Sequence, residues 1–216
     1  MFSAGPALPP AKIADPDLLG HWTCDEVDGP WLRDASGHRR HGRMTGPMRL
    51  VEGRLGKALE FNGSAFIDFA DAPDLNLIEA MTLALWVRPQ RVGSMRLLDK
   101  GPAGGSDGYL LDTHPENHLR LIMRPGTMQA DARLPVGAWS HVAATFADQT
   151  QRVYLNGRIV TEMSGRGGTI TATAMPLRMG ADSDGGSRFV GLLDDVRIYR
   201  RALKPEEIAK LAEVSR

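Results

Sequence analysis

The sequence predicts an all-β domain, a two-sheet antiparallel jelly-roll sandwich closed by a short C-terminal helix. Short segments in which every second residue is apolar recur from Leu18 onward, separated by clusters of Gly, Asp, Asn and Pro. The 216 residues contain one helical pattern, near the end, and fit one sandwich domain. We therefore expect residues 1–17, rich in Ala, Pro and Gly, to be a lead-in or linker, and residues 18–216 to form the domain.

The two-residue period of a half-buried strand is clearest in residues 118–124. There Leu119, Leu121 and Met123 share one face. Residues 81–87 are apolar on both faces, so this strand is expected at the centre of a sheet. The same period marks residues 65–69, 139–146 and 196–199.

Local signals predict one hairpin and one helix. Asn156-Gly157 lies between two β-prone runs and predicts a tight hairpin, because both residues tolerate positive φ. Pro205 suits the first position of a helix, and Glu207 would lie near the positive end of its dipole. Ile208, Leu211 and Ala212 then form a short apolar stripe.

Charge and composition restrict the possible partners. The 26 basic and 26 acidic side chains cancel, so neither nucleic acid nor an anionic membrane is an expected partner. No apolar run approaches the ~20 residues of a membrane-spanning helix, and residues 1–10 lack the pattern of a signal peptide. The single cysteine, Cys24, rules out an internal disulfide.

Four groups of motifs follow one another in a fixed order. They are Trp22–Glu26 with Asp34–Gly37 and His41-Gly42; Gly56–Gly63 with Met81–Leu83 and Trp86–Pro89; Trp139–Ala143 with Val153–Gly157; and Gly191–Tyr199 with Ala202-Leu203 and Glu206–Ile208. Together they cover residues 18–212 and resemble the bacterial laminin-G-like modules of the concanavalin A-like lectin and glucanase jelly rolls. Two positions depart from that pattern: Lys204 replaces a helix-capping Ser or Thr, and His38–His41 replaces a stretch that often contains Asn.

The resemblance implies a non-catalytic recognition module. Its expected partner is a carbohydrate or surface glycan, as for a lectin. The module would belong to a larger sugar-processing protein, outside the cell or at its surface. A structural or protein-interaction domain without a sugar ligand is the alternative from another class. A glycosidase or polysaccharide lyase is the second alternative.

The glucanase signature is incomplete in this sequence. Glucanases of this fold carry Glu-x-Asp-x-x-Glu, which provides two carboxylates on one strand. The nearest stretch here runs from Glu26 to Trp31, with Asp28 in the middle, Pro30 in the strand and Trp31 at the last position. No catalytic residue is therefore predicted.

A structural calcium ion is the predicted cofactor. Ca²⁺ binds six to eight oxygens, and acidic clusters at residues 25–28 and 194–195 lie near the two ends of the domain. The first and last strands of a jelly roll often lie side by side, and the resemblance implies a calcium ion near that junction. Asp25 and Asp194 are the predicted ligands, with backbone oxygens completing the shell. In the alternative, these carboxylates cap turns or pair with Arg197 and Arg200.

Five residues are predicted to bind the saccharide. Trp31, in a turn-rich segment, would be a platform for a sugar ring or, alternatively, a lid on the core. Two glycine-rich loops would form the rim of the site, because loops on rigid sandwiches often bind ligands. The first, residues 101–108, contributes Asp107 and the adjoining Tyr109; the second, residues 182–186, contributes Asp182 and Asp184, unless it is a plain turn.

Overall fold

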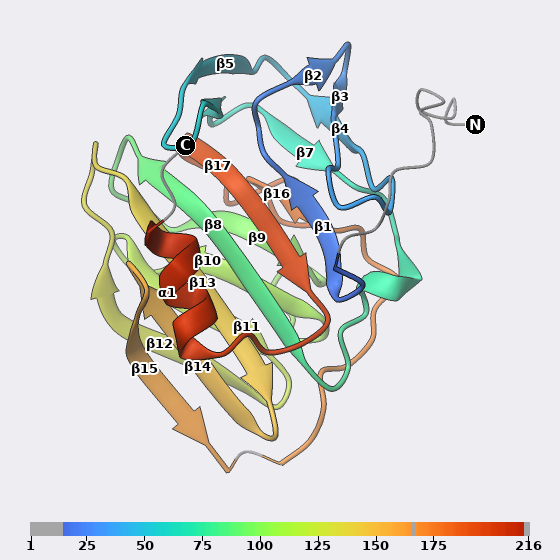
Figure 1. Cartoon of the computed structure of the whole chain (residues 1–216), viewed down its shortest axis with the longest axis vertical. Coiled ribbons are helices and arrows are strands. Elements are labelled where there is room, and N and C mark those ends of the chain that lie inside the picture. Colours follow the sequence, from blue (N-terminus) through green and yellow to red (C-terminus); the bar gives the residue numbers. More distant parts are fainter. Residues whose placement is uncertain (1–14, 166, 214–216) are drawn as a thin grey trace.

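The computed structural model describes residues 15–165 and 167–213, which form two antiparallel sheets packed face to face (Figure 1). The front sheet comprises β1 (Leu18–Trp22), β5 (Arg49–Glu52), β6 (Lys57–Asn62), β8 (Met81–Pro89), β13 (Ser140–Ala147), β14 (Thr150–Leu155), β15 (Arg158–Ser164) and β17 (Val190–Tyr199). The back sheet comprises β2 (Val27–Asp28), β3 (Trp31–Leu32), β4 (Gly42–Thr45), β7 (Phe66–Asp68), β9 (Met95–Lys100), β10 (Tyr109–Thr113), β11 (His118–Met123), β12 (Gly126–Arg133) and β16 (Arg178–Met179). A 3₁₀ turn, η1 (Pro73–Leu75), and one helix, α1 (Pro205–Glu213), complete the described elements. The predicted all-β sandwich with a closing helix is confirmed.

The strand order explains why residues 81–87 are apolar on both faces. In the front sheet the order is β15-β14-β13-β8-β17-β6-β5, so the doubly apolar β8 is central, as predicted. The first strand, β1, pairs with the last, β17, which places Trp22 opposite Val196. In the back sheet the order is β12-β11-β10-β9-β16-β7-β4-β3-β2.

The core lies between the two sheets. On β11, Leu119, Leu121 and Met123 are fully buried in it, while Arg120 and Ile122 point to the opposite, outer face. Each such apolar side chain contributes roughly 1.5–3 kcal/mol by leaving water. The alternation predicted for this strand is therefore the feature that decides which side chains reach the outer face.

The predicted hairpin joins β14 to β15. Asn156 and Gly157 have φ values of 50° and 79°, which a tight turn with two left-handed residues requires. The turn also contacts α1, because a Cβ at Gly157 would lie 3.1 Å from the Cα of Ala209. Glycine is thus required here by both backbone conformation and space.

The helix α1 begins without a capping hydroxyl at Lys204, yet its first turn is stabilised by another residue. The Glu207 carboxylate accepts the backbone N–H of Lys204 at 2.8 Å and two hydrogen bonds from Arg201, also at 2.8 Å. These bonds lower the pKa of Glu207 to about 2. Glu207 and Arg201 therefore stabilise the helix start in place of the Ser or Thr that Lys204 replaces.

Candidate functional site

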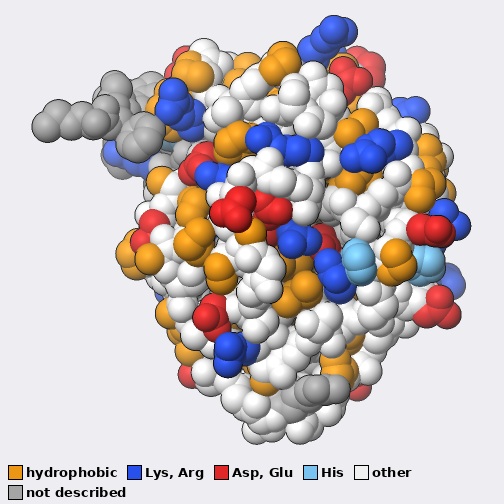
Figure 2. Space-filling view, turned by 180° about the vertical axis from the view of Figure 1, so that it is seen from behind, with side chains coloured by type: hydrophobic (Ala, Val, Ile, Leu, Met, Phe, Trp, Pro, Cys, Tyr) orange, Lys and Arg blue, Asp and Glu red, His pale blue; other side chains and the backbone are white. Residues whose placement is uncertain are grey.

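One row of side chains crosses the outer face of the back sheet. Trp31 on β3 lies opposite Arg43 on β4, Arg43 opposite Asp68 on β7, Asp68 opposite Arg178 on β16, and Arg178 opposite Asp99 on β9. Such directly opposed side chains interact across neighbouring strands. Figure 2 shows this face, where acidic and basic side chains are interspersed.

Ion pairs hold the charged part of this face in place. The Arg178 guanidinium donates to Asp68 at 3.1 Å and to the backbone carbonyls of Asp182 and Ser183 at 2.8 Å. Further along, Asp112 is fully buried and accepts hydrogen bonds from Arg96 and Arg120. Bidentate pairs of this kind fix side-chain geometry. The face is therefore a rigid platform.

A cavity of about 460 Å³ opens at the Trp31 end of the row. Such a volume is typical of small-ligand sites. Its lining residues come from β3, β4, β7, the residue before β4, and the segments that follow β7 and precede β16: Trp31, His41, Arg43, Thr45, Asp68, Phe69, Ala70, Asp71 and Pro176.

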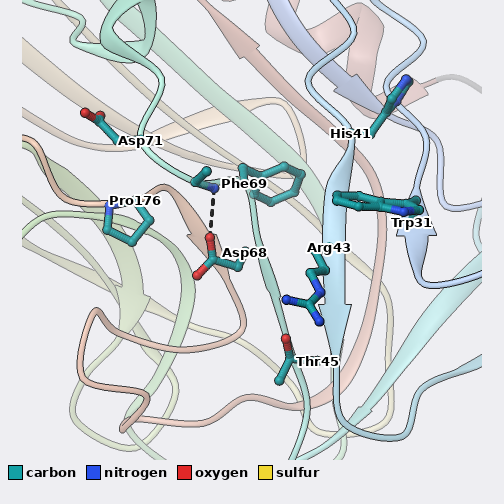
Figure 3. Close-up of a pocket in the computed structure, with 9 residues that line it drawn as sticks. Trp31, His41, Arg43, Thr45, Asp68, Phe69, Asp71 and Pro176 are labelled. Carbon is teal, nitrogen blue, oxygen red and sulfur yellow. Dashed lines mark hydrogen bonds between the residues drawn. The ribbon is translucent and has the colours of Figure 1, made fainter. Parts of the chain in front are cut away.

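The side chains around the cavity have distinct directions (Figure 3). The Trp31 ring lies beside the Phe69 ring, and the Arg43 side chain extends toward Thr45, while Asp71 and Pro176 lie on the opposite side. The imidazole of His41 points away from Trp31. The cavity thus combines an aromatic wall with guanidinium, carboxylate and hydroxyl groups.

Buried contacts support the aromatic wall. The Phe69 ring packs against the core residue Trp22, with ring centroids 4.4 Å apart. The Phe69 N–H donates to the carbonyl of Leu177 at 3.0 Å, and Asp68 accepts the N–H of Ala70 at 2.8 Å. These bonds connect the cavity to the sandwich core.

The imidazole of His41 is held in place by a hydrogen bond to the backbone. Nδ1 accepts the backbone N–H of Asp34 at 3.0 Å. Burial lowers the pKa of His41, with a contribution from neighbouring arginines, so the imidazole is neutral at pH 7 and carries its proton on Nε2. His41 therefore adds no positive charge to the cavity.

Of the five predicted ligand-binding residues, Trp31 alone lines the cavity. Asp182 is buried, and its carboxylate accepts the N–H of Gly186 at 2.5 Å, as in a plain glycine-rich turn. Asp107 forms an ion pair with Arg124 at 2.8 Å, and Asp184 is exposed. The two loops do meet, because Ala103 N–H donates to Ser183 Oγ at 2.8 Å.

The prediction for Tyr109 is corrected by the structure. Its ring faces inward from β10 and is 1 % exposed within the core. Burial raises its pKa well above the ordinary value. The sequence interpretation placed Tyr109 beside the loop at residues 101–108, on the rim of a ligand site, whereas strand β10 begins at this residue and turns it toward the core.

Sequence reasoning assigned one of the nine lining residues, Trp31, to ligand binding, and it missed Arg43, Thr45, Asp68 and Phe69 among the others. One signal was present. The period of residues 65–69 places Asp68 on the face opposite Ile67, and Ile67 is fully buried. That pattern gives the face of Asp68, but it does not give the strands beside it.

The two predicted calcium ligands lie at another corner, where both bind one turn. Asp25 accepts the N–H of Lys57 at 2.9 Å, and Asp194 Oδ2 accepts the N–H groups of Arg54 and Leu55, each at 2.8 Å. Both carboxylates thus cap the turn between β5 and β6, as in the alternative interpretation. Across residues 15–165 and 167–213, no group of three or more His, Cys, Asp or Glu side chains is arranged to hold a metal ion.

Asp194 nevertheless has one unused oxygen. Its Oδ1 is buried without a hydrogen-bond partner in the described part of the chain. Burial raises the pKa of Asp194 to about 7, with help from the neighbouring carboxylates of Asp195 and Asp25. This oxygen can take a proton or a cation.

The geometry defines the class of protein first: an antiparallel jelly-roll sandwich with an aromatic-walled cavity on the outer face of one sheet. The family is shown by the sequence. The chain belongs to the concanavalin A-like lectin/glucanases superfamily, whose laminin-G model matches residues 61–209. No helix in the described residues is long and apolar enough to cross a membrane.

Individual relatives agree with this assignment. The chain is 28 % identical over 147 residues to adhesion G-protein coupled receptor V1 of Danio rerio, a match that covers 62 % of this chain and 2 % of the receptor. It is 26 % identical over 153 residues to usherin of Homo sapiens, covering 66 % of this chain and 3 % of usherin. The chain therefore spans a small part of these curated relatives.

A solved structure shows the same fold. Domain 4 of AbnA, an extracellular arabinanase of Geobacillus stearothermophilus solved in complex with arabinotriose, superposes with a TM-score of 0.72 and 22 % sequence identity. The match covers 91 % of this chain and 98 % of that domain.

Proposed function

We propose that this domain is a non-catalytic carbohydrate-recognition module that binds a saccharide in the cavity beside Trp31. The observation that carries the proposal is the placement of an aromatic ring next to Arg43, Asp68 and Thr45 around one opening. Specific small-molecule sites have this composition, with an apolar wall and a few polar groups that fix orientation.

Each part of the cavity matches one property of a sugar ring. The face of a pyranose or furanose ring is apolar and packs on an aromatic ring such as Trp31. Its hydroxyls both donate and accept hydrogen bonds, so Asp68 provides acceptors, Arg43 donors and Thr45 both. The arrangement favours a saccharide over a wholly apolar ligand.

The state of the two lining carboxylates supports binding without hydrolysis. Asp68 is paired with Arg178 at 3.1 Å, and Asp71 with Lys100 at 3.2 Å. A glycosidase needs one carboxylic acid and one carboxylate facing the same bond. Two carboxylates that are each held by a cation favour a binding role.

The relatives extend the proposal to location and ligand. Domain 4 of AbnA is part of an extracellular arabinanase and was solved with arabinotriose. We propose by analogy that this chain acts outside the cell or at its surface, as one module of a longer protein. Arabinotriose is therefore included among the first probes.

The test is calorimetric titration against arabinotriose, xylotriose, cellotriose and sialyllactose, followed by Trp31→Ala. Loss of the aromatic wall should weaken binding at least about tenfold, because truncation of an anchoring aromatic residue costs about 2 kcal/mol or more. The melting temperature should hardly change, because Trp31 lies outside the core cluster. The control is Val136→Ala, an exposed residue away from the cavity.

Two outcomes would count against the proposal. Unchanged affinity in Trp31→Ala would exclude the cavity. Binding to no saccharide in a broad glycan panel would favour the protein-interaction role instead.

We also propose that a calcium ion binds at Asp25 and Asp194, where the unpartnered Oδ1 of Asp194 supplies one ligand. Calcium would replace the proton that burial favours there, and backbone carbonyls and water would complete its shell. Binding to the folded state alone raises the melting temperature by mass action. We expect the melting temperature to rise in millimolar CaCl₂ relative to EDTA, and Asp194→Asn to abolish the rise; equal melts in both buffers would contradict the proposal.

A further inference from the structure

A fully buried lysine lies behind one wall of the cavity. Lys100, at the end of β9, is 0 % exposed. Its Nζ donates to Asp71 Oδ1 at 3.2 Å and to the carbonyls of Met175 at 2.8 Å and Thr173 at 3.4 Å. One ammonium group thus joins two segments that are far apart in the sequence.

The contacts of Lys100 satisfy all its donors. An ammonium group has three N–H donors, and here each has an acceptor. Burial of a charge is nevertheless costly, and apolar side chains in place of a whole buried ion pair often give equal or better stability. Stability alone therefore does not explain a lysine here, whereas placement of its three acceptors does.

The joined segments form the side of the cavity opposite Trp31. Asp71 and Pro176 line that side, and the Asp71 carboxylate points away from the opening (Figure 3). Residues 170–177 contain no helix or strand. A few other hydrogen bonds hold them, including Leu177 N–H to the carbonyl of Ala70 at 3.2 Å and Gly108 N–H to the carbonyl of Thr171 at 2.8 Å.

Gly108 allows the segment at residues 170–177 to lie close to the end of β9. A Cβ at Gly108 would overlap the backbone carbonyl of Lys100 and lie 2.9 Å from the Thr173 side chain. The loop at residues 101–108, predicted to contact the ligand, therefore lies against the segment that forms the wall.

We infer that Lys100 is a positioning residue for saccharide binding: by holding Asp71 and the 173–176 segment together, it sets the distance of this wall from Trp31. The inference rests on the proposed function of the cavity. Lys100 is fully buried, so its effect on saccharide affinity would be indirect, through the position of the wall.

The experiment compares Lys100→Met with Lys57→Met. Lys57 is a matched control because its ammonium pairs with Glu52 at 3.0 Å on the surface. Hydrogen exchange of both variants is measured without ligand. In Lys100→Met, amide exchange at residues 171–177 should rise about tenfold, while exchange at Leu119 and Leu121 of β11 stays unchanged, because local openings are independent of global unfolding. Lys57→Met should alter neither region.

The second readout is affinity for whichever of the four titrated saccharides the wild-type domain binds. Lys100→Met should weaken it at least about fivefold, and Asp71→Asn, which keeps an acceptor oxygen but loses the charge, should weaken it less. Asp71 is partly exposed, so this variant still reports if Lys100→Met fails to fold. If the wild-type domain binds none of the four, the proposed function loses its support, and the exchange data still decide whether Lys100 positions the wall. Unchanged exchange at residues 171–177, an equal rise throughout the domain, or unchanged affinity would overturn the inference.

Discussion

The outer faces of the two sheets are stabilised in different ways. On the front sheet, the small residues Ala84 and Ala143 leave room for α1, and Ile208 of the helix packs there against Tyr154 and Leu203. On the back sheet no helix of the described residues covers the strands, and arginines and aspartates pair with one another. The apolar outer face of the front sheet is covered by α1, which stabilises the fold but leaves no access for a ligand. A face of paired charges stays accessible, and the cavity lies on that face.

The difference also concerns how each face tolerates change. Apolar packing under α1 loses energy in proportion to the atoms removed. A buried ion pair loses more, because the remaining charge has no partner. The two faces should therefore respond differently to single substitutions, and the back sheet should give the larger effect.

The largest effect is expected for Asp112→Ala. This carboxylate is fully buried between Arg96 and Arg120, which are themselves 11 % and 18 % exposed. Its removal leaves the Arg120 guanidinium without the carboxylate that it pairs with and leaves Arg96 with Asp99 alone, and should lower the free energy of unfolding by about 3–5 kcal/mol, measured by urea denaturation. Glu116→Ala, at an exposed pair with Arg133, is the control and should change it by less than ~0.5 kcal/mol. Equal effects of the two variants would mean that the buried network does not hold the back sheet together.

A smaller effect is expected on the front sheet. Ile208→Ala removes the fully buried anchor of α1. The cavity it leaves should cost about 2–4 kcal/mol in urea denaturation. Saccharide affinity should be unchanged, because α1 packs on the outer face of the front sheet, whereas the cavity lies on the back sheet. A loss of affinity at 25 °C, where the variant is folded, would show that the two faces are coupled.

The smallest effect depends on pH. Burial raises the pKa of Asp99 from 3.8 to about 6, despite its hydrogen bond with Arg96. The folded state therefore binds more protons than the unfolded state between about pH 4 and pH 6. Stability contributed by Asp99 should fall as pH rises through that window, by roughly 2–3 kcal/mol in total, and stay level above it.

The contribution of Asp99 is obtained as the difference in unfolding free energy between the wild type and a variant that lacks this carboxylate. Urea denaturation at several pH values is compared between the wild type and Asp99→Asn, which does not titrate. The difference should slope between about pH 4 and pH 6 and then level off. A flat difference across this range would mean that Asp99 is solvated or fully compensated by Arg96.

The strands and the helix could be predicted because each depends on local periodicity. The period of residues 118–124 and the Asn156-Gly157 turn need no knowledge of distant segments, and both predictions were confirmed. The pairing of the first strand with the last required the resemblance. Residues 1–14 of the predicted lead-in lie outside the described residues.

The site was predicted only in part, for a physical reason. Trp31 was singled out because it falls in a turn-rich segment, and it lines the candidate cavity. Its neighbours Arg43 and Asp68 become a site only when β3, β4 and β7 pair in one register, which sequence spacing does not give. Asp182 was misleading because an aspartate before glycines suits a ligand loop and a self-capping turn equally well.

The glycine at the β14–β15 turn restricts how this scaffold can vary. Because Gly157 touches Ala209, the hairpin tip and the helix must change together, and any longer tip would push the helix off its sheet. Insertions should therefore be tolerated poorly at that end of the molecule. New specificities would arise more readily by exchange of segments around the opening on the other sheet, which α1 does not cover.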